Sequence, residues 1–192
     1  HAHQQCVVHR DVKPLNMLLD RKHGTIKLID FGLAVATDVT RYTQQGEVFG
    51  TIAYMAPEQL QGKADQIGPW SDVYSLGVTL FELLTLQLPF EGANQQAYAH
   101  SVLTQEARSA RSVVRTISRD LQVVIRKALE KAPRDRYRDA AQFAIDLANV
   151  LEYRPIEARP ISSIGRIWRW TRRKPMHAAL VGVLLAGVPS VT

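Results

Sequence analysis

The chain has 192 residues, of which 46% are hydrophobic, and it carries a formal net charge of +6. A chain of this length and hydrophobic content can bury a core, which excludes an intrinsically disordered protein. Cys6 is the only cysteine, so the composition also excludes a disulfide framework and a paired-cysteine metal site, and it favours a reducing cytosolic setting.

The excess positive charge lies in one segment. Residues 153–175 contain seven Lys and Arg residues against the single acidic residue Glu157, a balance that equals the net charge of the whole chain. The rest of the sequence is therefore electrically balanced, and we expect no nucleic-acid partner.

The sequence of the first 30 residues predicts a short β-hairpin. The chain begins with His1, and we interpret it as a fragment whose first helix is truncated. Residues 17–20 and 25–29 are rich in Leu and Ile and are typical of two strands, joined by a turn that includes Gly24. This hairpin would place Asn16 and Asp30 at neighbouring ends.

Helices dominate the rest of the sequence. Residues 33–49 show no periodicity and predict a long surface loop. Residues 73–84 are apolar on most faces, and Ser71 is placed to cap this helix, which we predict to be the buried central helix of the core. Further helices are expected at 94–104, 118–129 and 139–151.

Three short motifs follow one another along the chain: HRDVKPLN at 9–16, DFG at 30–32 and APE at 56–58. Two Asp, one Lys and one Asn on neighbouring turns can position the groups needed to transfer a phosphoryl group from ATP. The motifs resemble the C-terminal lobe of a eukaryotic-like (Hanks-type) bacterial Ser/Thr protein kinase. This resemblance implies a mainly α lobe of the α+β kinase fold over residues 1–152, with the hairpin at the catalytic site.

The resemblance assigns a role to each polar residue of the catalytic motifs. Asp11 would accept the proton of a substrate Ser or Thr hydroxyl, and Lys13 would contact the γ-phosphate of ATP. Asn16 and Asp30 would hold Mg²⁺ through oxygen atoms. Thr51 would hydrogen-bond Asp11 and Lys13, and together with Lys13 it indicates specificity for Ser or Thr over Tyr.

The resemblance also implies control by phosphorylation of the loop after DFG. Arg10, which precedes the catalytic aspartate, would pair with a phosphate on this loop. The candidate acceptors are Thr43, the best match in position, and then Thr40 and Thr37.

Three further residues match positions that support the lobe itself. Glu58 of the APE motif is expected to form a buried ion pair with Arg136, and the loss of one partner would leave a buried charge. Asp72 is expected to hydrogen-bond the backbone of the HRD segment.

The tail resembles the membrane anchor of bacterial receptor-type Ser/Thr kinases. Residues 153–175 would form a basic juxtamembrane linker with Trp168 and Trp170 at the interface, and the uncharged residues 176–192 would begin a transmembrane helix. The resemblance implies a single-pass protein of the bacterial cell membrane with a cytoplasmic kinase lobe. It also implies protein substrates, and it is compatible with a homodimer that phosphorylates itself in trans.

Two alternatives remain open from the sequence. The chain contains no Gly-rich loop, no strand lysine for the phosphates and no glutamate partner for that lysine, so we expect the isolated chain to be inactive. A parent protein without these residues would be a pseudokinase or scaffold. A small-molecule phosphotransferase of the aminoglycoside-kinase type shares the Asp and Asn loop, although such enzymes lack the APE segment.

Overall fold

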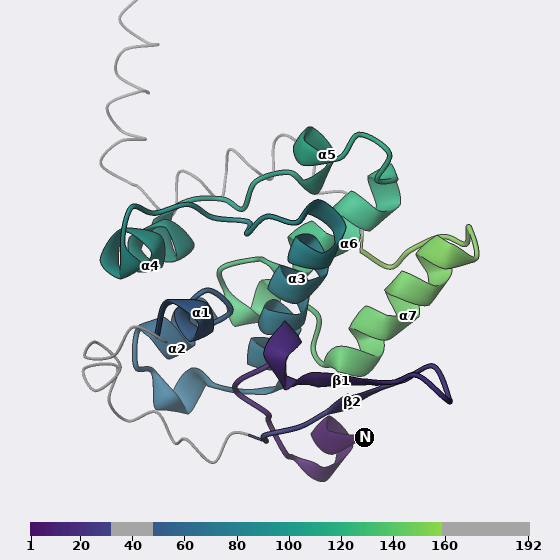
Figure 1. Ribbon diagram of the computed structural model, residues 1–192, viewed down its shortest axis with the longest axis horizontal. Helices are drawn as coiled ribbons and strands as arrows, with labels where there is room; N and C mark the ends of the chain where they lie inside the picture. The colour runs from purple at the N-terminus through teal and green to yellow at the C-terminus, as the bar shows by residue number, and fades with distance from the viewer. Residues whose placement is uncertain (32–47, 159–192) are drawn as a thin grey trace, which may run out of the picture. The chain divides into compact units, whose positions relative to one another are not determined.

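The computed structural model describes residues 1–31 and 48–158. These residues form a helical unit with one two-stranded sheet (Figure 1). In chain order the elements, with η for a 3₁₀ helix, are η1 (Ala2–Gln5), η2 (Pro14–Asn16), β1 (Met17–Asp20), β2 (Thr25–Leu28), α1 (Val48–Ile52), α2 (Pro57–Leu60), η4 (Ala64–Gln66), α3 (Pro69–Thr85), α4 (Gln95–Thr104), α5 (Ala110–Val113), α6 (Arg119–Ala128), η5 (Pro133–Asp135) and α7 (Ala140–Leu151).

Strands β1 and β2 form the antiparallel hairpin that the sequence predicts. Met17 lies opposite Leu28 at the open end of the hairpin. Beyond this pair, the backbone N–H of Ile29 donates to the carbonyl of Asn16 over 2.9 Å. The hairpin therefore brings Asn16 and Asp30 to neighbouring ends, as predicted.

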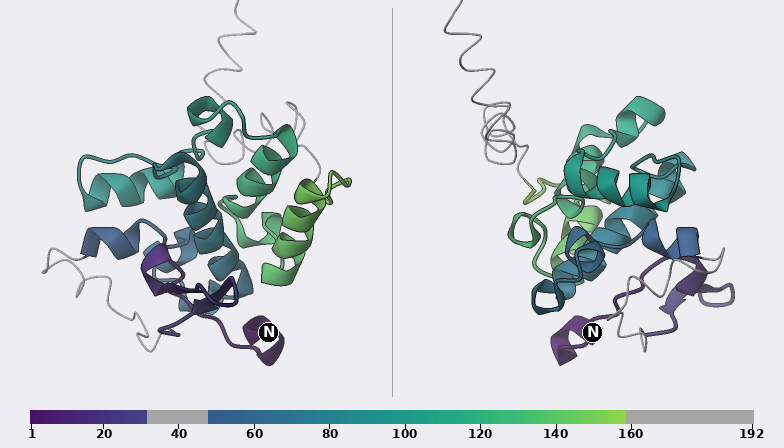
Figure 2. Two further views of the ribbon diagram at one scale, coloured as in Figure 1. Left: turned by 45° about the vertical axis from the view of Figure 1, so that its right-hand side comes forward. Right: turned by 90° about the vertical axis from the view of Figure 1, so that its left-hand side faces the viewer.

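Helix α3 runs through the centre of the unit and packs against α5, α6 and α7 (Figures 1 and 2). Tyr74, Val78 and Phe81 on this helix are fully buried, which confirms the predicted central helix. Its predicted start at Ser71 is wrong. Pro69 occupies the first helical turn, where its missing N–H costs nothing, so the helix begins earlier and Ser71 lies inside that turn.

Two clusters of buried side chains surround α3. The first joins α3 to α4 and to residues 52–56, and the second joins α3 to α6 and α7. Gly77 allows the close approach of α3 and α6, because a Cβ at this position would lie 2.9 Å from the Cβ of Ala128. Packing on both sides thus fixes α3 as a rigid support for the loops at its N-terminal end.

Each of the other three predicted helices begins directly after a residue that caps its N-terminus. Side-chain oxygens of Asn94, Ser118 and Asp139 accept hydrogen bonds from backbone N–H groups three residues later, over 2.8, 3.1 and 2.9 Å. Helices α4, α6 and α7 follow these caps directly. The helices predicted at 94–104, 118–129 and 139–151 are thus confirmed, and a local capping bond fixes where each one begins.

The lobe extends past the predicted boundary at residue 152. The buried carboxylate of Asp146 on α7 accepts the backbone N–H groups of Glu157 and Ala158, over 2.7 and 2.8 Å, and the hydroxyl of Tyr137 over 2.9 Å. Ala158 is only 1% exposed. Residues 153–158 therefore belong to the folded unit, and this corrects the assignment of the linker to residues 153–175.

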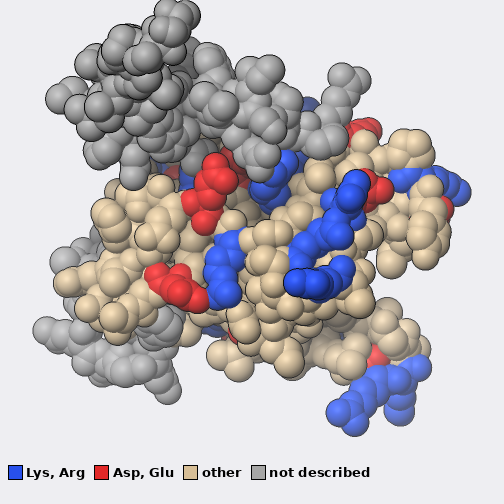
Figure 3. Space-filling model, turned by 90° about the horizontal axis from the view of Figure 1, so that it is seen from above, with Lys and Arg blue, Asp and Glu red and all other residues tan. Residues whose placement is uncertain are grey.

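Several predicted features lie outside the described residues. These are Thr37, Thr40 and Thr43, residues 159–175 of the basic segment, and the partial transmembrane helix at 176–192. Within residues 1–31 and 48–158, no helix combines the length and the hydropathy needed to cross a bilayer. Figure 3 shows Lys and Arg side chains together with Asp and Glu side chains on the face of the described unit seen from above.

Leu86, directly after α3, is held in a conformation that favours glycine. It has φ 56° and ψ 25° and is 88% exposed, so its side chain gains little from packing. We expect Leu86→Gly to raise the free energy of unfolding by about 1 kcal/mol, because the strain of a left-handed leucine exceeds the added entropy of the unfolded glycine chain. Urea unfolding of the two proteins measures this, with Leu86→Ala, which keeps the strain, as the control. A less stable glycine variant would contradict the expectation.

Buried tyrosines make the lobe sensitive to alkaline pH. Burial raises the pKa of the phenols of Tyr74, Tyr98 and Tyr137 well above the usual value of about 10. Above pH 10 the unfolded chain releases these protons while the folded chain retains them, so ionisation favours unfolding. The free energy of unfolding should therefore fall with increasing pH above 10, by about 1.4 kcal/mol per pH unit for each such group.

Urea unfolding at pH 8 and pH 11 measures this fall, and Tyr74→Phe isolates one contributor. The Tyr74 hydroxyl is buried and makes no hydrogen bond with the described residues, so its removal leaves no partner unpaired. The variant should match or exceed the wild-type stability at pH 8 and lose less of it at pH 11. Equal losses in the two proteins would show that Tyr74 does not contribute.

Candidate active site

The structure brings Asp11, Lys13 and Thr51 into one hydrogen-bonded cluster. The ammonium group of Lys13 donates to Oδ2 of Asp11 over 2.8 Å and to Oγ1 of Thr51 over 3.0 Å. Asp11 and Lys13 lie on the loop before η2, whereas Thr51 lies on α1, 38 residues further along the chain. The contact between these distant segments is the one that the resemblance implies for Thr51.

Asn16 completes this cluster from the start of the hairpin. Its side-chain nitrogen donates to the backbone carbonyl of Asp11 over 2.7 Å and to Oδ2 of Asp11 over 3.0 Å. Oδ2 of Asp11 is thus held by two donors, and Oδ1 makes no hydrogen bond with the described residues. The side-chain oxygen of Asn16 is likewise left available to a cation.

Asp30 follows β2 and has a left-handed backbone with φ 56°. Its carboxylate is exposed and forms no ion pair or hydrogen bond with residues 1–31 and 48–158. With the free oxygen of Asn16 at the neighbouring hairpin end, it offers hard oxygen ligands, which fit Mg²⁺. No group of three or more His, Cys, Asp or Glu side chains among the described residues could hold a metal alone.

Asp72, in the first turn of α3, holds the backbone of the HRD segment. Its Oδ2 accepts the N–H of His9 over 2.7 Å and its Oδ1 accepts the N–H of Arg10 over 2.8 Å. The carboxylate is almost fully buried, so these bonds are protected from competing water. The rigid central helix therefore sets the position of the loop that carries Asp11, as predicted for Asp72.

His3 is a further partner of Asp72 that the sequence analysis missed. Its Nε2 lies 2.8 Å from Oδ2 of Asp72, and its Nδ1 accepts the N–H of Ala140 at the start of α7 over 3.2 Å. Because Nδ1 accepts, we infer that Nε2 carries the proton donated to Asp72. His3 thus ties the N-terminal segment, α3 and α7 together.

His9 has a structural role, which its contacts define. Its Nδ1 accepts the N–H of Asp11 over 3.3 Å, so its Nε2 donates to the carbonyl of Ile29 over 2.9 Å. Its ring packs against that of Phe31, with the centroids 4.7 Å apart. His9 therefore joins the HRD loop to the segment that carries Asp30.

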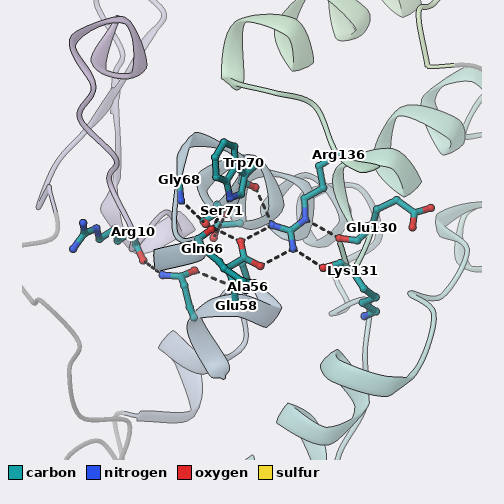
Figure 4. A network of polar contacts seen from close by, with 12 residues as sticks. Arg10, Ala56, Glu58, Gln66, Gly68, Trp70, Ser71, Glu130, Lys131 and Arg136 are labelled. Atoms are coloured by element: carbon teal, nitrogen blue, oxygen red, sulfur yellow. Dashed lines mark hydrogen bonds and ion pairs between the residues drawn. The ribbon is translucent and has the colours of Figure 1, made fainter. Parts of the chain in front are cut away.

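Glu58 and Arg136 form the predicted buried ion pair (Figure 4). Nη1 of the guanidinium donates to Oε1 of Glu58 over 2.7 Å, and Nη2 donates to Oε2 over 2.8 Å. The remaining N–H groups donate to the backbone carbonyls of Trp70, Glu130 and Lys131, and Oε1 also accepts the hydroxyl of Ser71. All five N–H groups of the guanidinium are thus bonded, which compensates for the desolvation of the pair.

Comparison with known proteins agrees with this geometry. The protein kinase domain family matches residues 1–145. The chain belongs to the protein kinase domain family. Ser/Thr-protein kinase PknB of Mycobacterium leprae is 40% identical over 158 residues, which cover 82% of this chain and 25% of that protein. PrkC of Bacillus subtilis, also named a Ser/Thr-protein kinase, is 38% identical over 152 residues, covering 79% of this chain and 23% of that protein. The chain therefore spans about a quarter of the length of these relatives.

A solved structure shares the fold of this kinase domain. It is the crystal structure of Rad53 residues 1–466 in complex with AMP-PNP, with a TM-score of 0.57 and 26% sequence identity. The match covers 74% of this chain and 34% of the Rad53 chain. This chain therefore resembles a known kinase structure in the arrangement of its helices as well as in its motifs.

The segment between Thr51 and APE of this kinase domain is fixed by contacts that the sequence analysis did not foresee. Tyr54 donates its hydroxyl to Oε2 of Glu82 over 2.5 Å, and its carbonyl accepts the hydroxyl of Ser75 over 2.8 Å. The hydroxyl of Tyr98 donates to the carbonyl of Ala53 over 3.2 Å. Burial and the bond to Glu82 raise the pKa of Tyr54, so its phenol stays protonated at neutral pH.

Of the residues predicted to take part in control by phosphorylation, only Arg10 lies within the described part of the chain. The Arg10 side chain is exposed, while Thr37, Thr40 and Thr43 lie outside the described residues. The pairing of Arg10 with a phosphorylated threonine therefore stays a prediction.

Proposed function

We propose that this chain supplies the catalytic lobe of a protein kinase that transfers the γ-phosphate of ATP to Ser and Thr hydroxyls of proteins. The observation that carries the proposal is the cluster of Asp11, Lys13, Asn16 and Thr51, in which Oδ2 of Asp11 is bonded and Oδ1 makes no hydrogen bond with the described residues. The family match and the printed names of the mycobacterial and Bacillus relatives support the same activity.

The contacts within this cluster support a separate role for each side chain in the proposed transfer. Lys13 and Asn16 hold Oδ2 of Asp11, so Oδ1 is the atom that can accept a hydrogen bond, and then the proton, from the substrate hydroxyl. Lys13 uses two of its three N–H groups on Asp11 and Thr51, which leaves one for a phosphate oxygen. This arrangement orients the hydroxyl oxygen toward the phosphorus atom beside a fixed positive charge.

Mg²⁺ and ATP are part of the proposal. Asn16 and Asp30 would hold the ion, which when bound neutralises the charge of the triphosphate that would otherwise repel Asp11 and Asp30. The neighbouring hairpin ends support this assignment, as does the side-chain oxygen of Asn16, which makes no hydrogen bond with residues 1–31 and 48–158.

We also propose that the kinase is anchored in the bacterial cell membrane by a single span, with its lobe in the cytoplasm. The support is in the sequence alone: the basic residues and tryptophans up to 175 precede a run without charged residues. Protein substrates are expected, and a homodimer would allow Thr43, Thr40 or Thr37 to be phosphorylated in trans. Carbonate extraction of membranes from cells that make the complete protein tests the anchor, and recovery in the extract would refute it.

A transfer assay with several acceptors tests the proposed activity. The complete protein is incubated with Mg²⁺ and γ-labelled ATP, together with peptides that offer Ser, Thr or Tyr and, separately, with an aminoglycoside. We expect label on the Ser and Thr peptides only. Label on the aminoglycoside alone would assign a small-molecule phosphotransferase, and nucleotide binding or protein binding without any transfer would assign a pseudokinase or scaffold.

A further inference from the structure

The backbone of Arg10, next to the catalytic aspartate, is held by side chains from two distant helices. Its N–H donates to Asp72 on α3, and its carbonyl accepts Nε2 of Gln59 on α2 over 2.8 Å. Arg10 has φ 69°, a left-handed conformation that is unfavourable for a residue with a Cβ. Such a conformation persists only where the surroundings impose it, and these two bonds do so.

The carbonyl that Gln59 holds belongs to the peptide group that connects Arg10 to Asp11. The N–H of this same peptide donates to Nδ1 of His9 over 3.3 Å. The plane of the peptide is therefore fixed at its oxygen by Gln59 and at its hydrogen by His9. Because this plane precedes the Cα of Asp11, its orientation sets the direction in which the Asp11 carboxylate leaves the backbone.

The contacts of Gln59 require an amide of this length. Its Oε1 accepts the N–H of Ala56 over 3.0 Å, while its Nε2 donates to Arg10 (Figure 4). One end of the side chain must accept and the other must donate, so a glutamate of the same shape could satisfy Ala56 but not the Arg10 carbonyl. Gln59 is half-buried; its bond to Ala56 is partly buried, and its bond to the Arg10 carbonyl is exposed to solvent.

Gln59 is carried by a helix that cannot shift easily. The preceding residue, Glu58, is locked by two hydrogen bonds to the buried guanidinium of Arg136. Helix α2 is thereby joined to the segment between α6 and α7, and Gln59 extends this connection to the catalytic loop (Figure 4).

We propose that Gln59 is a positioning residue for phosphoryl transfer, which holds the peptide group before Asp11 and so aims its carboxylate at the substrate hydroxyl. The role rests on the proposed kinase function, because it acts on the orientation of Asp11. It predicts that loss of the Gln59 amide lowers kcat, while the KM values for ATP and peptide stay close to those of the wild type.

Gln59→Glu in the complete protein is the sharpest test, with Gln61→Glu as the matched control. Gln61 is exposed and lies two residues away, so it receives the same change of charge without touching the loop. We expect Gln59→Glu to lower kcat for a Ser peptide by about 10- to 100-fold, with both KM values within about 2-fold of wild type. Gln59→Met removes the bonds without adding a charge and should also lower kcat. This variant provides the test if Gln59→Glu folds poorly.

Hydrogen exchange of residues 7–13 gives a second readout that does not depend on activity. Exchange at the amides of Arg10 and Asp11 should be faster in Gln59→Glu and Gln59→Met and unchanged in Gln61→Glu. Wild-type kcat in both variants at position 59, or a rise in KM alone, would overturn the positioning role. If the wild type transferred no phosphate, the kinase assignment would fail, and unchanged exchange in the variants would separately refute the contact between Gln59 and the loop.

Discussion

Asp11→Asn in the complete protein is expected to lower kcat for peptide phosphorylation by about 10²- to 10⁴-fold. The amide has the shape of the carboxylate and can still accept the hydrogen bond from Lys13, but it cannot take the proton of the substrate hydroxyl. It also removes the negative charge that Lys13 balances. Steady-state kinetics with a Ser peptide measures the loss, which should fall on kcat more than on the two KM values.

Asp65→Asn provides the control for this substitution. Asp65 is exposed on η4, and its side chain makes no hydrogen bond or ion pair with the described part of the chain. Replacing the carboxylate of Asp65 by an amide should leave kcat at the wild-type value. An Asp11→Asn enzyme with more than half of the wild-type kcat would rule out Asp11 as the base.

Arg136→Ala is expected to lower the free energy of unfolding by about 3–5 kcal/mol. The substitution would leave the carboxylate of Glu58 buried without a charge partner, and it would leave the carbonyls of Trp70, Glu130 and Lys131 without their donors. Both side chains of the ion pair are at most 2% exposed, so water cannot replace the lost bonds without opening the lobe. Urea or thermal unfolding measures the loss.

Arg134→Ala is the matched control, because Arg134 is exposed two residues earlier and forms no ion pair with the described residues. It should change stability by no more than about 0.5 kcal/mol. The double variant Glu58→Met with Arg136→Met should lose less than the sum of the two single variants, since neither charge is then left alone. Additive losses would mean that the two residues act independently.

Short-range signals account for most of what the sequence predicted correctly. Asn94, Ser118 and Asp139 cap helices through backbone groups three residues away, so a short window of sequence contains the whole interaction. The hairpin is also local, because its turn directly joins its two strands. The apolar character of α3 predicted its burial. Its start was predicted wrongly, because Ser71 is a residue type that often caps helices, whereas the helix begins at Pro69 and contains Ser71 in its first turn.

Contacts between residues far apart in the sequence were predicted only where both residues match positions of the kinase family. Glu58 and Arg136 are 78 residues apart, and Asp72 is 62 residues from Arg10; composition and periodicity contain no signal for either pair. Gln59 and His3, which belong to no motif quoted from the sequence, were missed for this reason. The end of the lobe was placed too early because Asp146 holds Glu157 and Ala158 through their backbone N–H groups. Almost every residue type has such a group, so the side chains at 157 and 158 give no sign of the contact.

The dependence of transfer on Mg²⁺ tests most directly whether Asp11, Lys13, Asn16 and Asp30 act on a metal-bound triphosphate. Initial rates of Ser-peptide phosphorylation are measured against Mg²⁺ concentration for the complete wild-type protein and for Asp30→Asn. We predict no transfer when Mg²⁺ is chelated, saturation of the wild type as Mg²⁺ is added, and a large shift of the variant to higher Mg²⁺. Transfer by the wild type without divalent ions, or identical Mg²⁺ titrations for the two proteins, would contradict the assignment.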